Sequence, residues 1–101
     1  MDITINKLDG RMVVAFIGDF DNAASAKAQR NLAPVYECVD CDILIDCTQL
    51  EYISSSGLRI LLTIFKQAHG NGHTAILKGM MDEVEEAIDM SGLLDLFVVE
   101  K

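Results

Sequence analysis

The sequence predicts a single-domain α/β fold, in which helices pack against a mixed, mostly parallel sheet that opens with a hairpin. Short apolar runs alternate along the chain with segments of helical periodicity, which is the pattern of strands joined by helices. The chain has 101 residues, enough for one hydrophobic core. Half of its residues are apolar and only one is proline, so we expect one ordered domain over residues 1–101.

The first elements are predicted to be the two strands of the hairpin. Ile3 and Ile5 alternate with polar neighbours, as in a strand with one buried face. Asp9-Gly10 is a typical two-residue hairpin turn, and residues 12–17 form a near-continuous apolar strand after it. The sheet should therefore begin with an antiparallel pair.

A loop and a broken helix are expected next. We interpret residues 18–22 as a loop, because they are mostly polar and begin with glycine. Either Asp21 or Asn22 can cap the alanine-rich helix that follows, since both side chains accept hydrogen bonds from free backbone N–H groups. Pro34 should kink or split that helix, because proline has no N–H to donate to the preceding turn.

The middle of the chain predicts a buried strand and then a long amphipathic helix. Residues 43–45 form a short apolar run that ends at Asp46. Gly70 should end the helix, as glycine commonly does. The apolar residues expected along one face of this helix are Leu58, Leu61, Leu62, Phe65 and Ala68.

The last part of the chain predicts a strand, a helix and a final strand. The two strands are expected at residues 74–77 and 96–99. Asp82 has the position of a helix cap, since Glu85 follows it by three residues, and the helix should end near Gly92.

The cysteines and histidines do not favour a metal site or a disulfide framework. Cys38, Cys41 and Cys47 are an odd number in a chain that we expect to be cytosolic. The first two have redox spacing, but they follow a predicted helix and precede a strand, whereas thioredoxin-like thiols open a helix that lowers their pKa. His69 and His73 have no thiolate or carboxylate pair nearby, so we expect them to be loop residues.

The charge of the chain excludes some classes of partner. Sixteen acidic and eight basic residues give a net charge of −8, which argues against nucleic acid because phosphates attract basic surfaces. The longest apolar runs are far shorter than the roughly 20 residues of a membrane span. No signal sequence opens the chain, and we expect it to be cytoplasmic. The acidic surface fits a basic protein partner, and it equally fits solubility alone.

Three consecutive serines are the most unusual local feature. Ser54, Ser55 and Ser56 stand between a short loop and the long helix, at the end of the sheet where functional loops gather in α/β folds. A helix start favours negative charge, so a phosphoryl group would be accommodated there. A helix cap needs only one hydroxyl, however. The run therefore predicts a cap and leaves open a phosphorylation switch.

Three segments resemble motifs of the STAS family, and in particular the bacterial anti-sigma-factor antagonists. Gly-Asp-Phe-Asp at 18–21 is similar to the family's Gly-Glu-Leu-Asp before the first helix. Residues 50–58 resemble its Leu-x-x-hydrophobic-hydrophobic-Asp-Ser-Ser-Gly-Leu, and residues 89–93 resemble its Asp-Met-Ser-Gly-Leu. The resemblance covers essentially the whole chain and implies a STAS-like fold.

The resemblance implies a partner switch in which this chain catalyses nothing and needs no cofactor. The unphosphorylated antagonist binds an anti-sigma factor that is also a serine kinase, and a sigma factor is released. The kinase phosphorylates the antagonist and ends the complex, and a serine phosphatase restores it. By position the acceptor is Ser55, with Ser54 as second choice. The residues expected to meet the partner are Asp19, Asp21, Asn22, Ser54, Ser56, Gly57 and Arg59.

Two positions depart from the family pattern. Ser54 replaces the motif aspartate, so the carboxylate that usually stands beside the acceptor is missing. Arg59 stands where the family often has a small residue. It lies one helical turn after Ser55, where it could pair with a phosphoryl group or remain a solvated helix residue.

The sequence is also compatible with other functions. A STAS domain could act as a scaffold or transport-complex subunit without phosphorylation. Asp19, Asp21 and Asp46 could instead form the carboxylate cluster of a response-regulator receiver, although a hairpin strand precedes them here. A phosphatase of the haloacid dehalogenase type would need a longer chain.

Overall fold

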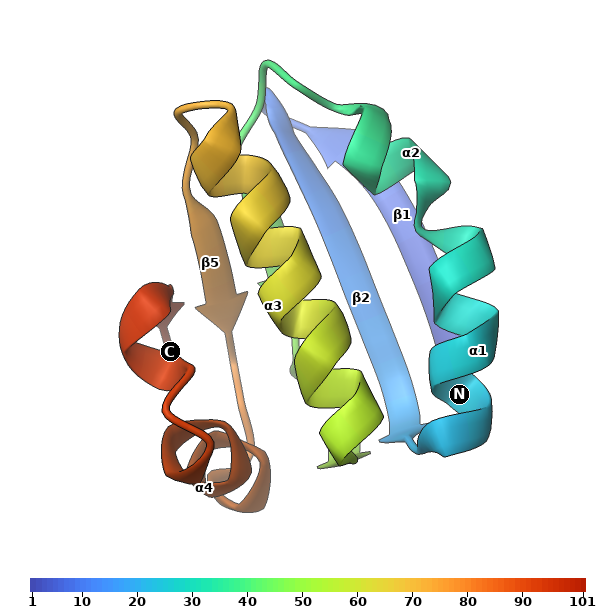
Figure 1. The fold of residues 1–101 in the computed structure, drawn as a ribbon. Coiled ribbons are helices and arrows are strands. Elements are labelled where there is room, and N and C mark those ends of the chain that lie inside the picture. The colour runs from blue at the N-terminus through green and yellow to red at the C-terminus, as the bar shows by residue number, and fades with distance from the viewer.

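The computed structural model describes residues 1–101 and shows one six-stranded sheet with its helices packed against it (Figure 1). The strands are β1 (Asp2–Leu8), β2 (Arg11–Phe20), β3 (Ile43–Asp46), β4 (Leu50–Ile53), β5 (Ala75–Lys78) and β6 (Val98–Glu100). The helices are α1 (Asn22–Asn31), α2 (Ala33–Glu37), α3 (Ser55–Gly70) and α4 (Asp82–Met90), with a 3-10 turn, η1 (Leu94–Leu96).

The sheet is mixed and mostly parallel, as the sequence predicts. Its strand order is β1-β2-β3-β5-β6, and only the β1–β2 pair is antiparallel. The short strand β4 pairs in parallel with the last residues of β2. Helices α1, α2 and α3 lie on one face of the sheet (Figure 1). The core fills the space between the two layers and includes 21 buried residues.

The hairpin that opens the sheet has the predicted turn. Asp9 has a φ of 52° and Gly10 a φ of 78°, so both central residues lie in the left-handed region. This is the geometry that matches the twist of two antiparallel strands, and Asp-Gly is one of the few pairs that adopt it readily. The prediction at this position is confirmed.

The prediction of a loop over residues 18–22 is wrong for residues 18–20. Strand β2 continues to Phe20, and the pairing register shifts between Gly18 and Asp19. Gly18 has a φ of 98° and lies at this register shift, inside the strand and not at its end. Beyond the residues that pair with β3, β2 pairs with β4 on both sides of this shift, and the sequence reasoning did not identify β4 as a strand.

The alanine-rich segment is split into two helices, as the proline predicts. Helix α1 ends at Asn31, and Pro34 lies in the first turn of α2, where its missing N–H costs nothing. Asp21, and not Asn22, caps α1. Gln67 of α3 donates a side-chain hydrogen bond to the carbonyl of Tyr36, so α2 is tied to the long helix.

Helix α3 is buried along a face slightly different from the one predicted. Its buried residues are Gly57, Ile60, Leu61, Ile64 and Ala68. Leu58, Leu62 and Phe65 are only half-buried at the sides of this face. The difference arises because α3 packs against both β5 and α1, so that its most buried line faces the sheet. Gly70 is its last residue, as predicted.

The C-terminal elements differ from the predictions at their ends. Asp82 is the first residue of α4 and not its cap, because Met81 takes the cap position without a side-chain bond. The last strand begins at Val98, since residues 94–96 form the 3-10 turn.

His69 is in the last turn of α3, and the ring nitrogen Nδ1 of His73 lies 3.1 Å from Asp42 Oδ1.

The expectation of no disulfide is also wrong. Cys38 and Cys41 are bonded, with their Cα atoms 6.3 Å apart, which is an ordinary separation for bridged residues. They lie between α2 and β3, as the spacing of predicted elements indicated. Cys47 is a free, buried thiol.

None of the helices combines the length and apolar character needed to cross a lipid bilayer.

The packing of α3 predicts that Gly57→Ala lowers the stability of the fold. A Cβ at Gly57 would lie 2.9 Å from Ile53 Cγ1 and 3.0 Å from Phe20 Cδ1, so the helix would have to move. Overpacking of a core typically costs about 1–3 kcal/mol, more than the ~1 kcal/mol that alanine gains in helix propensity. We expect a lower free energy of unfolding in urea denaturation.

Gly70→Ala is the matched control for this prediction. It makes the same substitution at the other end of the same helix, where no atom lies within 4 Å of the new Cβ. Its stability should stay equal to that of the wild type or rise slightly. A Gly57→Ala variant that matched or exceeded Gly70→Ala would contradict close packing at this point.

Candidate functional site

The candidate site is the end of the sheet where α1 and α3 begin. Both helices start at the same end of the molecule, next to the end of β2 (Figure 1). The backbone N–H of Ser54 donates a hydrogen bond of 2.8 Å to the carbonyl of Phe20. This bond sets the segment 19–22 beside the segment 54–57, although more than thirty residues separate them in the sequence.

The structure gives each of the three serines a different environment. Ser54 is the N-cap of α3: it is 8% exposed, and its Oγ accepts the N–H of Gly57 at 3.1 Å. The Ser56 hydroxyl is half-buried in a group of hydrogen bonds. Ser55 is exposed, and no hydrogen bond engages its hydroxyl. Only one of the three hydroxyls is therefore free and accessible.

Ser56 joins the starts of the two helices through its hydroxyl. Its Oγ lies 2.7 Å from Asn22 Oδ1, 3.0 Å from Ser54 Oγ and 2.8 Å from Ser25 Oγ. Ser25 in turn donates to the carbonyl of Asp21 at 3.0 Å. We call these side chains, from Asn22, Ser25, Ser54 and Ser56, the hydroxyl network. It fixes the position of α1 relative to α3 at the site.

Ser25 is the member of the network that sequence reasoning missed. It is 5% exposed and is one of only two buried polar residues in the chain, the other being Ser54. Its signal in the sequence is weak: a serine among alanines, four residues after the helix cap. A buried serine in a helix often bonds a carbonyl one turn back, and this one also reaches a second helix.

Asp21 has a structural role that leaves part of its carboxylate available. Its Oδ1 accepts the N–H of Ala24 at 2.8 Å and so caps α1. The side chain is exposed. A carboxylate can accept several hydrogen bonds, so the second oxygen can meet a donor from outside.

An exposed aromatic side chain lies beside a second carboxylate of this segment, that of Asp19. Asp19 on β2 pairs with Tyr52 on β4, so the two residues are neighbours across the strands. Both are exposed, and Tyr52 has 53% of its surface accessible. Large aromatic side chains are common anchors in protein interfaces. Tyr52 was not among the residues predicted for the site, because β4 itself was not recognised.

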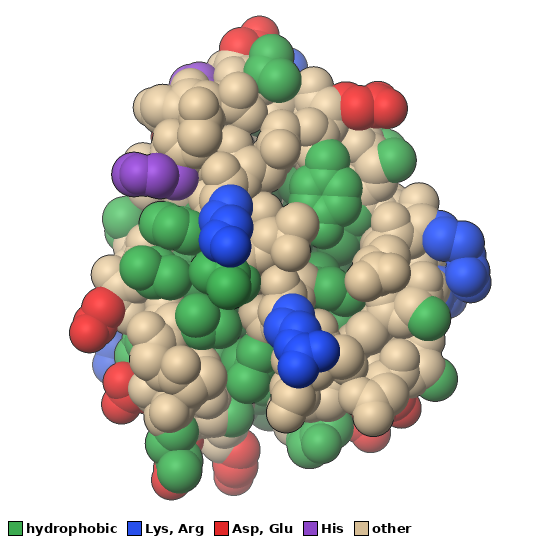
Figure 2. Space-filling view, in the orientation of Figure 1, with side chains coloured by type: hydrophobic (Ala, Val, Ile, Leu, Met, Phe, Trp, Pro, Cys, Tyr) green, Lys and Arg blue, Asp and Glu red, His purple; other side chains and the backbone are tan.

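The electrostatics at the start of α3 favour an anion. The first turn of the helix contains no acidic residue, although the chain as a whole is strongly acidic. Arg59 is exposed and makes no ion pair. Figure 2 shows basic side chains along the front of α3 and acidic ones mainly toward the periphery of this face. A free N-terminal helix dipole and an unpaired guanidinium lie within about one turn of Ser55.

The carboxylate cluster of a receiver domain is not formed. Asp46 accepts hydrogen bonds from the backbone and hydroxyl of Thr48, at 3.0 and 2.7 Å. Asp21 caps α1, and Asp19 lies beside Tyr52. Since each carboxylate has its own local partner or neighbour, the three do not converge on one ligand. The site offers an accessible hydroxyl at a helix start and no base bonded to it.

Comparison with known proteins gives a family for this arrangement. The protein-family model described as the STAS domain matches residues 2–101. The chain is 29% identical over 99 residues to BtrV of Bordetella bronchiseptica, a protein named as an anti-sigma factor antagonist, and the match covers 98% of this chain and 85% of BtrV.

Solved structures show the same fold. The unphosphorylated form of the anti-sigma factor antagonist SpoIIAA superposes with a TM-score of 0.81 at 16% identity, covering 99% of this chain and 89% of that one. The phosphorylated form of SpoIIAA from Bacillus gives a TM-score of 0.74 at 15% identity, covering 99% and 92% of the two chains. Because the family model matches nearly the whole sequence, the chain belongs to the STAS domain family.

Proposed function

We propose that the protein is an anti-sigma-factor antagonist that is switched by phosphorylation of Ser55. The observation that carries the proposal is the different state of the three serines: Ser54 and Ser56 are held by hydrogen bonds, and the exposed Ser55 hydroxyl is free. A kinase needs an accessible hydroxyl whose modification leaves the fold intact. Relatives named as anti-sigma factor antagonists, including BtrV, support the class of function.

The partner in this proposal is an anti-sigma factor that is also a serine kinase. It docks on the surface formed by the starts of α1 and α3, where Asp19, Asp21 and Arg59 are exposed. Tyr52 adds an apolar anchor at the edge of this surface.

The other residues predicted for the docking site support it from within. Ser54 and Gly57 are buried and hold the start of α3 in place, and Asn22 and Ser56 belong to the hydroxyl network. The antagonist supplies a rigid surface and one hydroxyl, and it catalyses no reaction. The kinase brings ATP, magnesium and the base. A serine phosphatase removes the phosphoryl group, and all three proteins act in the cytoplasm.

Phosphorylation acts in this proposal by charge and steric fit at the docking surface. It adds about −1.5 to −2 charges at the start of α3. The helix dipole stabilises negative charge there by roughly 0.3–1 kcal/mol, and Arg59 lies one turn away. Full switching of a complex needs a difference of about 5.5 kcal/mol in partner affinity between the two forms. A steric clash between the phosphoryl group and the closely packed partner must therefore supply most of this difference in affinity.

The first prediction of this proposal concerns the acceptor. Incubation with the cognate kinase and labelled ATP should phosphorylate the wild type and not Ser55→Ala, because no other hydroxyl of the run is exposed and free. Ser54→Asp is the matched control. Aspartate is also a good helix cap and restores the family's motif, so labelling should persist or increase. Label that survives in Ser55→Ala and disappears in Ser54→Asp would assign the site to Ser54.

The second prediction concerns Asp21. Asp21→Asn removes the charge and keeps the cap on Ala24, so the melting curve should not change. Binding to the kinase, measured by calorimetry, should weaken. The loss is expected to be about 2–5 kcal/mol if the carboxylate meets a desolvated basic group, and much less if it lies at the rim.

Glu86→Gln is the control for the Asp21 measurement. It removes one negative charge from the exposed side of α4 and leaves the proposed docking surface intact. Equal affinities for the two variants would mean that Asp21 acts only through net charge or only as a cap.

The third prediction is that phosphorylation leaves the fold unchanged. The start of α3 is anchored by buried residues such as Ile60 and Leu61, each of which contributes about 1.5–3 kcal/mol by burial. NMR amide shifts on phosphorylation should therefore be confined to residues 19–25 and 53–62. Shifts spread over the sheet and α4 would indicate refolding instead.

Mass spectrometry of the protein from its own cells tests the alternative of a scaffold function without phosphorylation. A scaffold of this kind would contain no phosphoserine.

A further inference from the structure

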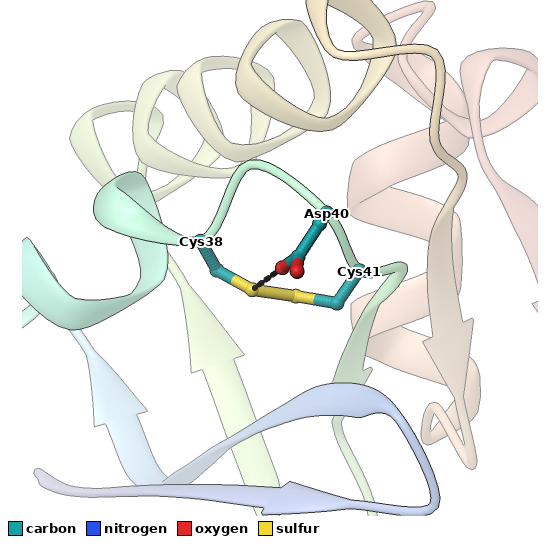
Figure 3. Close-up of side chains that lie close together, drawn as sticks. All are labelled: Cys38, Asp40 and Cys41. Atoms are coloured by element: carbon teal, nitrogen blue, oxygen red, sulfur yellow. Dashed lines mark hydrogen bonds between the residues drawn. A yellow bond between two sulfur atoms is a disulfide. The ribbon is translucent and has the colours of Figure 1, made fainter.

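The disulfide between Cys38 and Cys41 lies at the end of the molecule opposite Ser55. It bridges the connection from α2 to β3, whereas α3 begins at the other end of the sheet (Figure 1). Figure 3 shows the two sulfurs joined and the carboxylate of Asp40 turned toward them. Asp40 Oδ1 lies 3.8 Å from Cys38 Sγ, at a distance where the reduced Cys38 thiol can donate a hydrogen bond to it. The segment therefore has contacts suited to both the bonded and the reduced state.

We propose that Cys38 and Cys41 are a reversible redox modification site, formed by thiol–disulfide exchange with a low-molecular-weight disulfide such as oxidised glutathione. The proposal does not rest on the function proposed for Ser55. It rests on the disulfide between two cysteines of one short connection and on the unequal exposure of the two side chains.

The unequal exposure assigns a step to each cysteine. Cys38 is half-exposed and Cys41 is 3% exposed. During oxidation, the Cys38 thiolate attacks one sulfur of the external disulfide, forms a mixed disulfide and releases one thiol. The Cys41 thiolate then attacks Cys38 Sγ, forms the internal bond and releases the second thiol. Two electrons pass to the external disulfide, and the two cysteine protons end on the released thiols.

Asp40 should slow this exchange. A carboxylate near a sulfur disfavours the thiolate, which is the reacting form, and it also repels negatively charged glutathione. Lys7 lies 4.0 Å from Asp40 Oδ1 and offsets only part of this charge, since both side chains are exposed. The pair is also placed after a helix end and not at a helix start. These features predict a slow couple without the activated thiolate of a thioredoxin-like enzyme.

Cys47 serves as an internal reference for the pair. It is fully buried, and burial together with the charge of Asp46 raises the pKa of its thiol to about 12. A thiol of this kind is almost entirely protonated at neutral pH and out of reach of reagents. It should remain unmodified under all native conditions that oxidise the other two.

The test uses the whole reduced protein, equilibrated with EDTA in buffers of reduced and oxidised glutathione. Samples are quenched with acid, alkylated in denaturant and sequenced by tandem mass spectrometry. Internal disulfide formation consumes one oxidised glutathione and releases two reduced ones. A tenfold dilution of the glutathione buffer at constant composition should therefore raise the ratio of oxidised to reduced protein tenfold. After alkylation the reduced protein should carry three alkyl groups, and the oxidised species should carry one, on Cys47, and be bonded between Cys38 and Cys41.

Three variants test the assigned steps. Cys41→Ser should stop at a glutathione adduct on Cys38, and its adduct ratio should not change with dilution. Cys38→Ser should react much more slowly, because Cys41 is buried. The Asp40→Asn variant should exchange with glutathione about fivefold faster than the wild type at low salt, which is the effect expected for one exposed charge about 4 Å away. The difference in rate should be smaller at high salt.

The same measurements can overturn the proposal. A wild-type ratio that is insensitive to dilution, with a glutathione adduct as the final product, would show that no internal bond forms. A bond that includes Cys47, or no oxidised species in any buffer, would do the same. None of these outcomes would affect the test of Ser55, which uses kinase labelling.

Discussion

The pairing of the last residues of β2 with β4 is the constraint on which the site depends. Residues 12–15 of β2 pair with β3, and residues 18–20 pair with β4, which follows β3 in the chain. The bond from the Ser54 N–H to the Phe20 carbonyl closes this pairing. Because α1 follows directly from β2 and α3 from β4, the two helix starts must come together.

The hydroxyl network converts this proximity into a defined surface. The backbone pairing of β2 with β4 alone would bring the two helix starts into contact, but it would not fix how the helices are rotated relative to each other. The contacts of the Ser56 hydroxyl with Asn22 and Ser25 limit that rotation. Packing of Gly57 against Phe20 and Ile53 adds a steric limit on how closely α3 approaches the sheet. The hydroxyls of two of the three serines are thus engaged in hydrogen bonds within the fold. Ser55 is left as the serine with an accessible hydroxyl.

The two ends of the sheet carry different chemistry. At the end where the helices begin, unpaired backbone N–H groups and Arg59 favour negative charge and a protein partner. At the opposite end, α2 and β3 are joined by a short connection whose cysteines lie close enough to bond. The core between the two ends is a single buried cluster. A close-packed core keeps a local change at one end from altering the other, unless the fold has two arrangements, and nothing in this packing provides a second.

The sequence by itself determined the elements whose signals are local. The Asp9-Gly10 turn, the break at Pro34 and the end of α3 at Gly70 each depend on one or two residues, and they are where the sequence placed them. The mostly parallel pairing of the strands followed from their alternation with helices. Only the tertiary structure decided that β2 continues past Gly18, that residues 50–53 form a strand, and that Ser25 reaches Ser56. These features depend on pairing between segments that are distant in the sequence. Such pairing produces no periodic residue pattern in either segment alone, so the sequence of one segment cannot predict it.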